Sequence, residues 1–292
     1  MPINRQDADR RGKDDDMWPE NSTLLEITDK EFEELTKFVY GKYGIDLSRK
    51  RKLIEGRLSN TLKAKNMSTF EQYMKTLFAD KTGEEMHTFL NKITTNYSYF
   101  GRENDHFDFL MNHALPSLER RRDGDLRTWS AGCSSGQEAY NIAMVMDQYF
   151  GPRKKAWDTT ILATDISMNV LNKAKEGIYP GKDLEGLPPQ WRQKYFARIS
   201  NDTFQVNQNI RDEVIFRMSN LMEPFVYKKP FDIIFCRNVM IYFDAKTTAA
   251  LLRKFYDATA KGGYLFIGHS EAIDKRSTDY VCLRPAVYQK PL

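Results

Sequence analysis

The stretch from Leu126 to Gly136, LRTWSAGCSSG, is the most informative part of this chain about its fold. A short apolar segment runs into a turn that contains two glycines, and a helical pattern follows over residues 137–149. A strand, a glycine turn and a helix in this order are typical of a βα unit in a parallel sheet. Glycine lets the backbone of such a turn approach a ligand closely. The turn therefore predicts a ligand site at the carboxyl end of the strand.

The spacing of the glycines narrows the class of ligand. Gly132 and Gly136 enclose three residues, unlike the dinucleotide pattern G-x-G-x-x-G, and no G-x-x-x-x-G-K-[S/T] phosphate loop exists in the chain. A loose glycine turn after a strand is more typical of sites for adenosyl ligands that lack a pyrophosphate. Taken alone, the turn also fits a packing role, because many α/β proteins have such a glycine turn for packing reasons.

Further strand and helix patterns alternate after this turn, which predicts a Rossmann-like α/β domain with a mostly parallel sheet. The strand patterns cover residues 159–163, 231–236 and 264–268, and the helical patterns cover 169–175 and 247–260.

The alternation stops between residues 178 and about 217. Prolines interrupt this stretch, and two short strand patterns (204–206 and 214–216) replace the helices. We expect a small β insertion here, in a place well suited to partner recognition.

The region before the α/β domain shows helical patterns without strands. Thr28 and Glu31 form a capping box that opens the first helix. Residues 24–95 therefore predict an all-α helical domain, and residues 96–292 predict the α/β domain. Residues 1–23 are polar and charge-mixed, and we expect a disordered arm. The later helical patterns cover residues 48–65, 68–79 and 83–93.

Composition excludes several classes of protein. Hydrophobic residues make up 41% of the 292 residues, which is enough for a sizeable core. The net charge of +4 does not indicate a nucleic-acid partner. No apolar run approaches the roughly 18 residues of a membrane span, and the N-terminus lacks the apolar segment of a signal peptide. We expect a cytoplasmic monomer without direct membrane insertion.

Cysteine and histidine spacing predicts neither a disulfide framework nor a metal site. No two cysteines form a CxxC pair, and no histidine shares metal-ligand spacing with another histidine or a cysteine. We expect reduced thiols and structural histidines. The residues concerned are Cys133, Cys236, Cys282, His87, His106, His113 and His269.

Polar residues follow other strands at the predicted ligand edge. A carboxylate at Asp165, after the second strand, can accept hydrogen bonds from both hydroxyls of a ribose. Alternatively Asp165 caps the next helix, a role for which Ser167 competes. The strand 231–236 ends in Arg237 and Asn238, without the Asn/Asp-Pro-Pro-Tyr motif of enzymes that methylate amino nitrogens.

A polar and aromatic segment, residues 94–102, joins the two predicted domains. Clefts often lie at such junctions, although an ordinary linker with a helix cap has the same composition.

A basic cluster, residues 49–57, lies at the start of the second predicted helix. It reads either as a solvated helix face, as a phosphate-binding surface or as a docking surface for an acidic partner. No aromatic residues alternate with the charges, as base stacking would require. The cations are Arg49, Lys50, Arg51, Lys52 and Arg57.

Six motifs together resemble the chemotaxis receptor methyltransferases, the CheR family, and their order and separation match it across about residues 28–290. The resemblance implies an S-adenosylmethionine-dependent O-methyltransferase. It would convert glutamate side chains of chemoreceptors to methyl esters, release S-adenosylhomocysteine and tune adaptation in chemotaxis. The motifs are TTNYSYFGREN (94–104), WSAGCSSGQEAYNIAM (129–144), ATDISMNVLNKAKEGIY (163–179), NLM (220–222), FCRNVMIYF (235–243) and GGYLFIGHSE (262–271).

The resemblance also implies roles for individual residues. Asp165 would hold the ribose, and Glu138 would lie near the charged end of the cofactor. Arg102 and Tyr242 would lie beside the transferring methyl group and the incoming carboxylate. The basic cluster at 49–57 would face the acidic helical methylation region of the receptor. The implied cofactor contacts are Asn96, Ser98, Arg102, Glu138, Asp165, Asn220, Leu221, Arg237 and Asn238, with Asn220 and Leu221 flanking the adenine.

The chain departs from the family pattern at three places. Gly101 stands where an aromatic residue is usual, and Gln137-Glu138-Ala139 replaces Glu-Glu-Pro. The segment 199–203 lacks the glycine-rich loop that accompanies binding of a receptor C-terminal pentapeptide, so we expect a pentapeptide-independent enzyme.

Two other functions fit parts of this pattern. One is a methyltransferase with another acceptor, such as RNA or a small molecule, and the other is a non-catalytic sensor of S-adenosylmethionine or its product. The presence of both Arg102 and Tyr242 favours catalysis over sensing.

Overall fold

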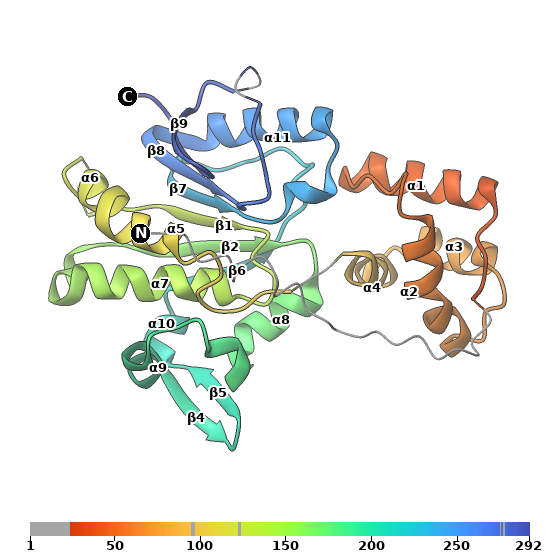
Figure 1. The fold of residues 1–292 in the computed structure, drawn as a ribbon, viewed down its shortest axis with the longest axis horizontal. Coiled ribbons are helices and arrows are strands. Elements are labelled where there is room, and N and C mark those ends of the chain that lie inside the picture. Colours follow the sequence, from red (N-terminus) through yellow and green to blue (C-terminus); the bar gives the residue numbers. More distant parts are fainter. Residues whose placement is uncertain (1–23, 95–96, 122–123, 275, 277) are drawn as a thin grey trace, which may run out of the picture.

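The structure is a computed structural model that describes residues 24–94, 97–121, 124–274, 276 and 278–292. A helical domain lies beside an α/β domain, and a small β-sheet projects from the α/β domain (Figure 1). The predicted arm, residues 1–23, and the predicted domain boundary at 95/96 lie outside the described residues.

The helical domain packs its helices around one apolar core, which includes Leu35, Ile54 and Phe89. The predicted capping box is confirmed, because Thr28 Oγ1 accepts from the amide of Glu31 while the Glu31 carboxylate accepts from the amide of Thr28. Among the described residues, no helix combines the length and the apolar character of a membrane span. The helices are α1 (Asp29–Tyr43), α2 (Arg51–Ala64), α3 (Phe70–Ala79) and α4 (Glu84–Ile93).

Helix α2 starts later than its pattern predicts. The Asp46 carboxylate accepts a hydrogen bond from the amide of Ser48, and the amide of Lys50 donates to the carbonyl of Leu47. These bonds fold residues 46–50 into a turn, so the helix begins at Arg51. Arg49 and Lys50 therefore precede the helix.

The main sheet of the described residues has the strand order β6-β2-β1-β7-β8-β10-β9. The first five strands are parallel, β10 is antiparallel to β8, and β9 is antiparallel to β10. The mostly parallel sheet is thus confirmed, with two antiparallel strands added at one edge. The strands are β1 (Thr128–Ala131), β2 (Ile161–Asp165), β6 (Val214–Met218), β7 (Phe231–Cys236), β8 (Thr259–Ile267), β9 (Val281–Arg284) and β10 (Val287–Gln289).

Alternate residues of the sheet enter two different cores. Ile233 and Phe235 of β7 join the core beneath α7 (Gln137–Phe150), whereas Ile234 and Cys236 join the core beneath α11 (Ala245–Ala258). The two helices accordingly lie on opposite faces of the sheet (Figure 1). Because β7 is buried on both faces, its sequence FDIIFC is apolar apart from the buried Asp232.

Several helical elements frame the sheet. The helical stretch over 105–119 had no counterpart in our sequence analysis, although it packs against α7. These elements are α5 (Asp105–Phe109), the π-helical η1 (Leu110–Ala114), α6 (Leu115–Glu119), the 3₁₀ segment η2 (Gly151–Ala156) and α8 (Met168–Glu176).

The projecting β-sheet has the strand order β3-β5-β4 and is antiparallel. One predicted part of the insertion lies elsewhere: β6 pairs in parallel with β2, from Ile161 with Val214 to Asp165 with Met218. Because β6 is an edge strand of the main sheet with exposed residues such as Met218, its sequence resembles an isolated short strand. The inserted elements are β3 (Ile178–Pro180), η3 (Gly181–Leu184), α9 (Pro189–Tyr195), β4 (Phe196–Ser200), β5 (Thr203–Val206) and α10 (Gln208–Arg211).

The helical domain contacts the α/β domain near the carboxyl ends of the parallel strands. The amide of Asp46 donates to the carbonyl of Tyr242 at 2.8 Å, and Ile45 forms an isolated β-bridge with Phe243. The Tyr40 hydroxyl donates to the Asp244 carboxylate at 2.9 Å. These bonds bring helical-domain residues to the edge where the predicted ligand site lies.

Candidate functional site

A cleft opens between the two domains at the carboxyl ends of β1, β2, β6 and β7, with an empty volume of about 1090 Å³ including its open mouth. The glycine turn after β1 forms one wall, and Tyr43 and Ile45 of the helical domain contribute to another. The other lining residues are Thr94, Tyr97, Ser98, Tyr99, Gly101, Arg102, Phe107, Gly132, Cys133, Ser134, Gln137, Glu138, Asn141, Thr164, Asp165, Ile166, Ser219, Asn220, Leu221, Arg237, Asn238, Val239, Tyr242 and Phe243.

The glycine turn brings its backbone to the cleft. Gly132 has φ 87°, and a Cβ atom at this position would overlap Cγ2 of Val239, so the turn requires glycine. Ser134 also has a positive φ, and its buried Oγ has no hydrogen-bond partner among the described residues. A buried hydroxyl in the wall of a cleft can complete its hydrogen bonds with a ligand.

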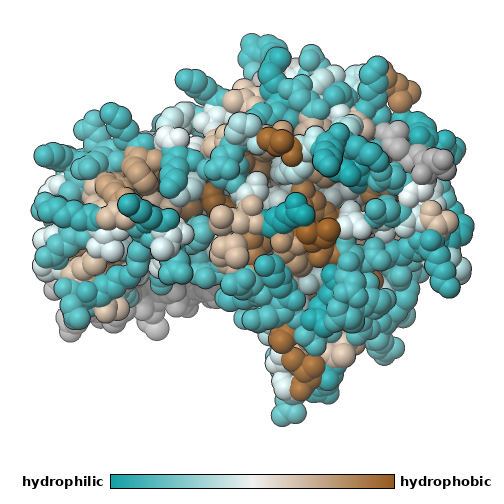
Figure 2. Space-filling model, turned by 180° about the vertical axis from the view of Figure 1, so that it is seen from behind, coloured by the Kyte–Doolittle hydropathy of each residue, from teal (hydrophilic) through white to brown (hydrophobic). Residues whose placement is uncertain are grey.

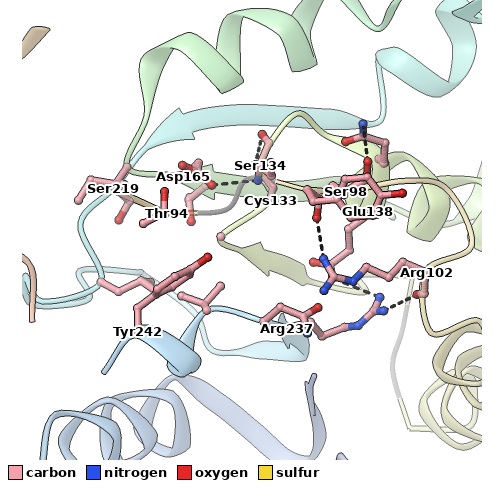
Figure 3. Close-up of a pocket in the computed structure, with 18 of the residues that line it drawn as sticks. Thr94, Ser98, Arg102, Cys133, Ser134, Glu138, Asp165, Ser219, Arg237 and Tyr242 are labelled. Atoms are coloured by element: carbon pink, nitrogen blue, oxygen red, sulfur yellow. Dashed lines mark hydrogen bonds and ion pairs between the residues drawn. The ribbon is translucent and has the colours of Figure 1, made fainter. Parts of the chain in front are cut away.

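Asp165 closes β2 at the centre of the cleft. Its carboxylate accepts hydrogen bonds from the amides of Ser134 (2.9 Å) and Ser167 (3.0 Å), as Figure 3 shows for Ser134. Ser167 is the N-cap of α8, and its hydroxyl accepts from the amide of Val170. Burial raises the pKa of Asp165, against the effect of these amides. Two carboxylate oxygens offer about four acceptor sites, so acceptor capacity is left for a ligand.

Arg237 is a buried cation between two carboxylates. Its guanidinium lies 3.2 Å from Glu103 Oε2 and 3.3 Å from Glu138 Oε2, and it donates to the carbonyl of Arg102. Burial raises the pKa of Glu138, and Arg237 opposes that shift. For Glu103, burial also opposes ionisation, but Arg237, His269 and Asn238 outweigh it and lower the pKa. Arg237 therefore organises this wall of the cleft as well as lining it.

Arg102 and Tyr242 enter the cleft from opposite sides (Figure 3). The guanidinium of Arg102 donates to the carbonyl of Tyr97 at 2.7 Å, which sets the direction of the side chain. The 3₁₀ segment η4 (Met240–Tyr242) carries Tyr242, which also packs against the core of the helical domain. Gly101 precedes Arg102 with φ 77°, and a Cβ there would lie 2.5 Å from the carbonyl oxygen of Gly186. An aromatic residue would not fit this backbone.

The other predicted cofactor contacts lie at the same cleft, except Asn96, which is outside the described residues. Ser98, Leu221 and Asn238 line it. Asn220 also lines it, but the polar atoms of its side chain join the domains: Nδ2 donates to the carbonyl of Lys42, and Oδ1 accepts from the amide of Met222.

The sequence analysis missed three kinds of site residue. Glu103 follows Arg102 within a quoted motif, but only the fold shows that its carboxylate pairs with Arg237. Ser134 belongs to the glycine turn itself. Tyr43 and Ile45 carry no local signal, because they reach the cleft only through packing of the domains.

Glu271, which ends the motif GGYLFIGHSE, holds the loop that carries Arg237 to Tyr242. Its carboxylate accepts hydrogen bonds from the amides of Gly268, Asn238, Met240 and Ile241. These bonds join the end of β8 to the end of β7 and keep Asn238 in its left-handed backbone conformation (φ 59°).

Replacing Glu271 by glutamine is expected to lower the free energy of unfolding by about 2 kcal/mol, because the new amide group faces backbone donors. Urea denaturation measures this, with the exposed Glu185→Gln as the matched control. Equal midpoints for the two variants would contradict the assignment of Glu271 as the anchor of this loop.

The basic cluster is not uniform. Arg51 donates to the carbonyl of Ile27 and pairs with Asp29, and Arg57 donates to the carbonyl of Lys92 at the end of α4. These two cations therefore support the fold of the helical domain. The cations with exposed side chains are Arg49, Lys50 and Lys52, of which Lys52 pairs with Glu55.

Two of the predicted structural histidines meet in space although they lie far apart in sequence. The rings of His106 and His269 pack edge to face with centroids 4.7 Å apart, next to Glu103. Burial, followed by the charges of Arg237, His269 and Arg284, lowers the pKa of His106 to about 2. Spacing along the chain could not reveal this grouping.

A Rossmann-like sheet, an acidic residue at the end of β2 and an open cleft at the strand ends fit the class of S-adenosylmethionine-dependent methyltransferases, and the family models show that class. The family model described as "CheR methyltransferase, SAM binding domain" matches residues 96–288, and the model "CheR methyltransferase, all-alpha domain" matches residues 30–94. The chain belongs to the CheR methyltransferase family.

Curated relatives agree with this assignment. The chain is 44% identical over 273 residues to a "Chemotaxis protein methyltransferase" of Borreliella burgdorferi, covering 91% of this chain and 96% of the relative. It is 38% identical to the protein of the same description from Escherichia coli K12, covering 85% and 86%. A solved S-adenosylmethionine-dependent methyltransferase from Mesorhizobium loti matches at 16% identity and a TM-score of 0.28, over 54% of this chain and 53% of its own.

The residues of the cleft fit S-adenosylmethionine, the cofactor of this family. The backbone at Gly132 and the Ser134 hydroxyl offer close approach and an unpaired polar atom. Asp165 keeps acceptor capacity beside them. The fit thus depends on a backbone that a ligand can approach, on a Ser134 hydroxyl without a partner among the described residues, and on the remaining acceptor capacity of Asp165.

Proposed function

We propose that this methyltransferase converts glutamate side chains of chemoreceptors to methyl esters, releases S-adenosylhomocysteine and so tunes adaptation in chemotaxis. The observation that carries the proposal is the pair Arg102 and Tyr242, which face one cleft from opposite sides (Figure 3). A guanidinium and a phenol can together hold a carboxylate beside a bound cofactor.

Methyl transfer to a carboxylate requires correct orientation of the reacting groups more than it requires a general acid or a general base. A glutamate carboxylate is ionised at neutral pH, so no residue has to remove a proton from it. S-adenosylmethionine, when bound, supplies an electrophilic methyl group with a neutral thioether as the leaving group. What the chain must do is hold the carboxylate in line with the methyl group and exclude water. Arg102 orients the carboxylate, while the rings of Tyr242 and Phe243 close the cleft on the side of the helical domain.

The remaining lining residues hold the cofactor. Asp165 accepts hydrogen bonds from the ribose hydroxyls, while Asn220 and Leu221 flank the adenine from the loop after β6. Glu138 lies near the charged end of the cofactor, where the ion pair with Arg237 stabilises the negative charge of the Glu138 carboxylate. Ser98 and Asn238 complete the same wall.

The exposed cations of the basic cluster face the acidic methylation region of the receptor. Ile45 lines the cleft, and Arg49 follows four residues later, so their Cα atoms lie at most about 14 Å apart. A receptor helix that enters the cleft beside Ile45 therefore passes close to Arg49 and Lys50. Opposite charges at this distance speed up the encounter of enzyme and receptor.

The projecting β-sheet supports a pentapeptide-independent enzyme. The connection between β4 and β5 is a tight turn at Asn201 and Asp202, without a glycine-rich loop. Apolar side chains gather at the tip of this projection and in the hollow between the two domains (Figure 2).

The test is methyl transfer from labelled S-adenosylmethionine to a purified cytoplasmic fragment of a chemoreceptor. We expect label that mild base releases as methanol, since esters hydrolyse there and methylated amines do not. The matched control is the same fragment with its candidate glutamates replaced by glutamine. Label that survives base, or that persists in the glutamine fragment, would exclude glutamate esterification.

Removal of the exposed cations is expected to affect receptor binding alone. The triple variant Arg49→Ala, Lys50→Ala, Lys52→Ala should raise KM for the receptor fragment about tenfold at low salt, with a smaller effect at high salt. The control variant Lys173→Ala, Lys175→Ala, Arg253→Ala removes the same number of exposed cations elsewhere. Steady-state kinetics measure both, and equal KM values would contradict the docking role.

A further inference from the structure

Three side chains from two regions of the chain converge behind the wall of the cleft. Glu103 follows the interdomain segment, His106 lies in α5, and His269 follows the end of β8. One ligand atom from each side chain lies within 4.8 Å of the corresponding atoms of the other two. His106 Nδ1 is 3.6 Å from Glu103 Oε2. This distance is longer than a hydrogen bond and leaves the pair unbonded.

His106 has no hydrogen-bond partner to explain its burial. Its side chain is fully buried, and neither ring nitrogen finds a donor or acceptor among the described residues. Buried polar atoms in folded proteins are almost always satisfied, so an unpaired imidazole calls for an unseen partner. A neutral imidazole offers a lone pair, and a neighbouring histidine and carboxylate offer two further donors to the same partner.

The surroundings of His269 resemble the outer shell of a metal site. Its Nε2 lies 3.0 Å from Asp105 Oδ1, and Asp105 also pairs with Arg284. A carboxylate on one ring nitrogen fixes the tautomer and the orientation of the imidazole, as is usual for metal-binding histidines.

We propose that Glu103, His106 and His269 form a binding site for one divalent transition-metal ion. Two imidazoles and one carboxylate suit Zn²⁺, Co²⁺ or Ni²⁺, with a water molecule as a fourth ligand, whereas Mg²⁺ and Ca²⁺ prefer oxygen donors alone. The half-exposed ring of His269 gives the ion a route from solvent.

The site is coupled to the methyltransferase cleft through Glu103. The same carboxylate pairs with Arg237, which lines the cleft and contacts Glu138. A metal ion on Glu103 competes with Arg237 for this carboxylate and repels the guanidinium. Metal and S-adenosylmethionine therefore weaken each other's binding, by the same factor in both directions.

The test uses the full chain with Cys282→Ser, which removes the exposed thiol as an unrelated metal ligand. Titration with Co²⁺ should give visible absorption bands typical of tetrahedral coordination, at one equivalent, and Zn²⁺ should displace them. His269→Ala should reduce the Co²⁺ affinity at least about tenfold. The matched control is His113→Ala, an exposed histidine outside the group. Circular dichroism confirms that both variants are folded.

Absence of the Co²⁺ bands, or equal affinities for the His269 and His113 variants, would overturn the proposal. Isothermal titration with S-adenosylmethionine, with and without one equivalent of Zn²⁺, tests the coupling. We expect weaker cofactor binding with Zn²⁺ in the parent protein and no such change in His269→Ala. Equal loss of affinity in both proteins would assign the effect to another site.

Discussion

Replacing Arg102 by alanine is expected to lower kcat/KM for methyl transfer by about 10²–10³-fold, the loss typical for one preorganised charged group at a reacting centre. The guanidinium faces the cleft and is held by one described hydrogen bond, to the carbonyl of Tyr97. Few packing contacts are lost with it, so the melting temperature should change little. Arg102→Lys should recover only part of the rate, because an ammonium group lacks the planar fork that holds a carboxylate.

The measurement is initial-rate kinetics with the receptor fragment at saturating S-adenosylmethionine, beside a thermal melt of each variant. The matched control is Arg276→Ala, whose guanidinium is exposed and pairs only locally with Asp274. A folded Arg102→Ala variant with turnover within about threefold of the parent would exclude a role for this residue in orienting the acceptor. Such a result would favour the sensor hypothesis.

Replacing Asp165 by alanine is expected to weaken S-adenosylmethionine and S-adenosylhomocysteine alike, by about 10²–10³-fold. Two hydrogen bonds to a carboxylate contribute about 1.5–3 kcal/mol each, and the partial overlap of their effects gives this range. The variant also releases the amide of Ser134, which loosens the turn after β1. Asp165→Asn keeps the shape and one acceptor oxygen, so its loss of affinity should be smaller.

Isothermal titration with both ligands measures these affinities. Asp158→Ala is the matched control, because Asp158 lies before β2 and accepts from the amide of Thr160 at the opposite end of the sheet. Equal affinities for the Asp165 and Asp158 variants would contradict the ribose assignment. A loss confined to S-adenosylmethionine would instead point to the charged end of the cofactor, since both ligands carry the same ribose.

The class of fold could be predicted from local patterns because each pattern reports a local physical preference. The capping box at Thr28 and the apolar run of β7 are decided by neighbouring residues and by burial on both faces. The glycine turn is partly local, since the positive φ at Gly132 favours glycine, although the close approach of Val239 adds a tertiary reason. The strand pattern of β6 was recognised but assigned to the insertion. An edge strand with one exposed face carries only half of the apolar pattern, so its place in the main sheet was not visible.

The site could be predicted only in part, for a related reason. Strand ends carry their polar residues to one edge of the sheet, so the positions of Asp165, Arg237 and Asn238 follow from the order of the strands. The motifs added Arg102 and Tyr242 through resemblance to a family. Tyr43 and Ile45 could not be found in this way, because they enter the cleft only through the contact between domains.

Local patterns were enough to predict the two kinds of domain, because such patterns depend on interactions within about one helix or strand. The resemblance to the CheR family added S-adenosylmethionine as the cofactor, and the edge of the sheet where it binds stays a prediction. The fold was needed to show that Arg237 lies between two carboxylates, that Arg57 supports α4, and that His106 meets His269. Such contacts join residues more than thirty positions apart. Their energies depend on burial and on the charges brought together, which no local pattern records.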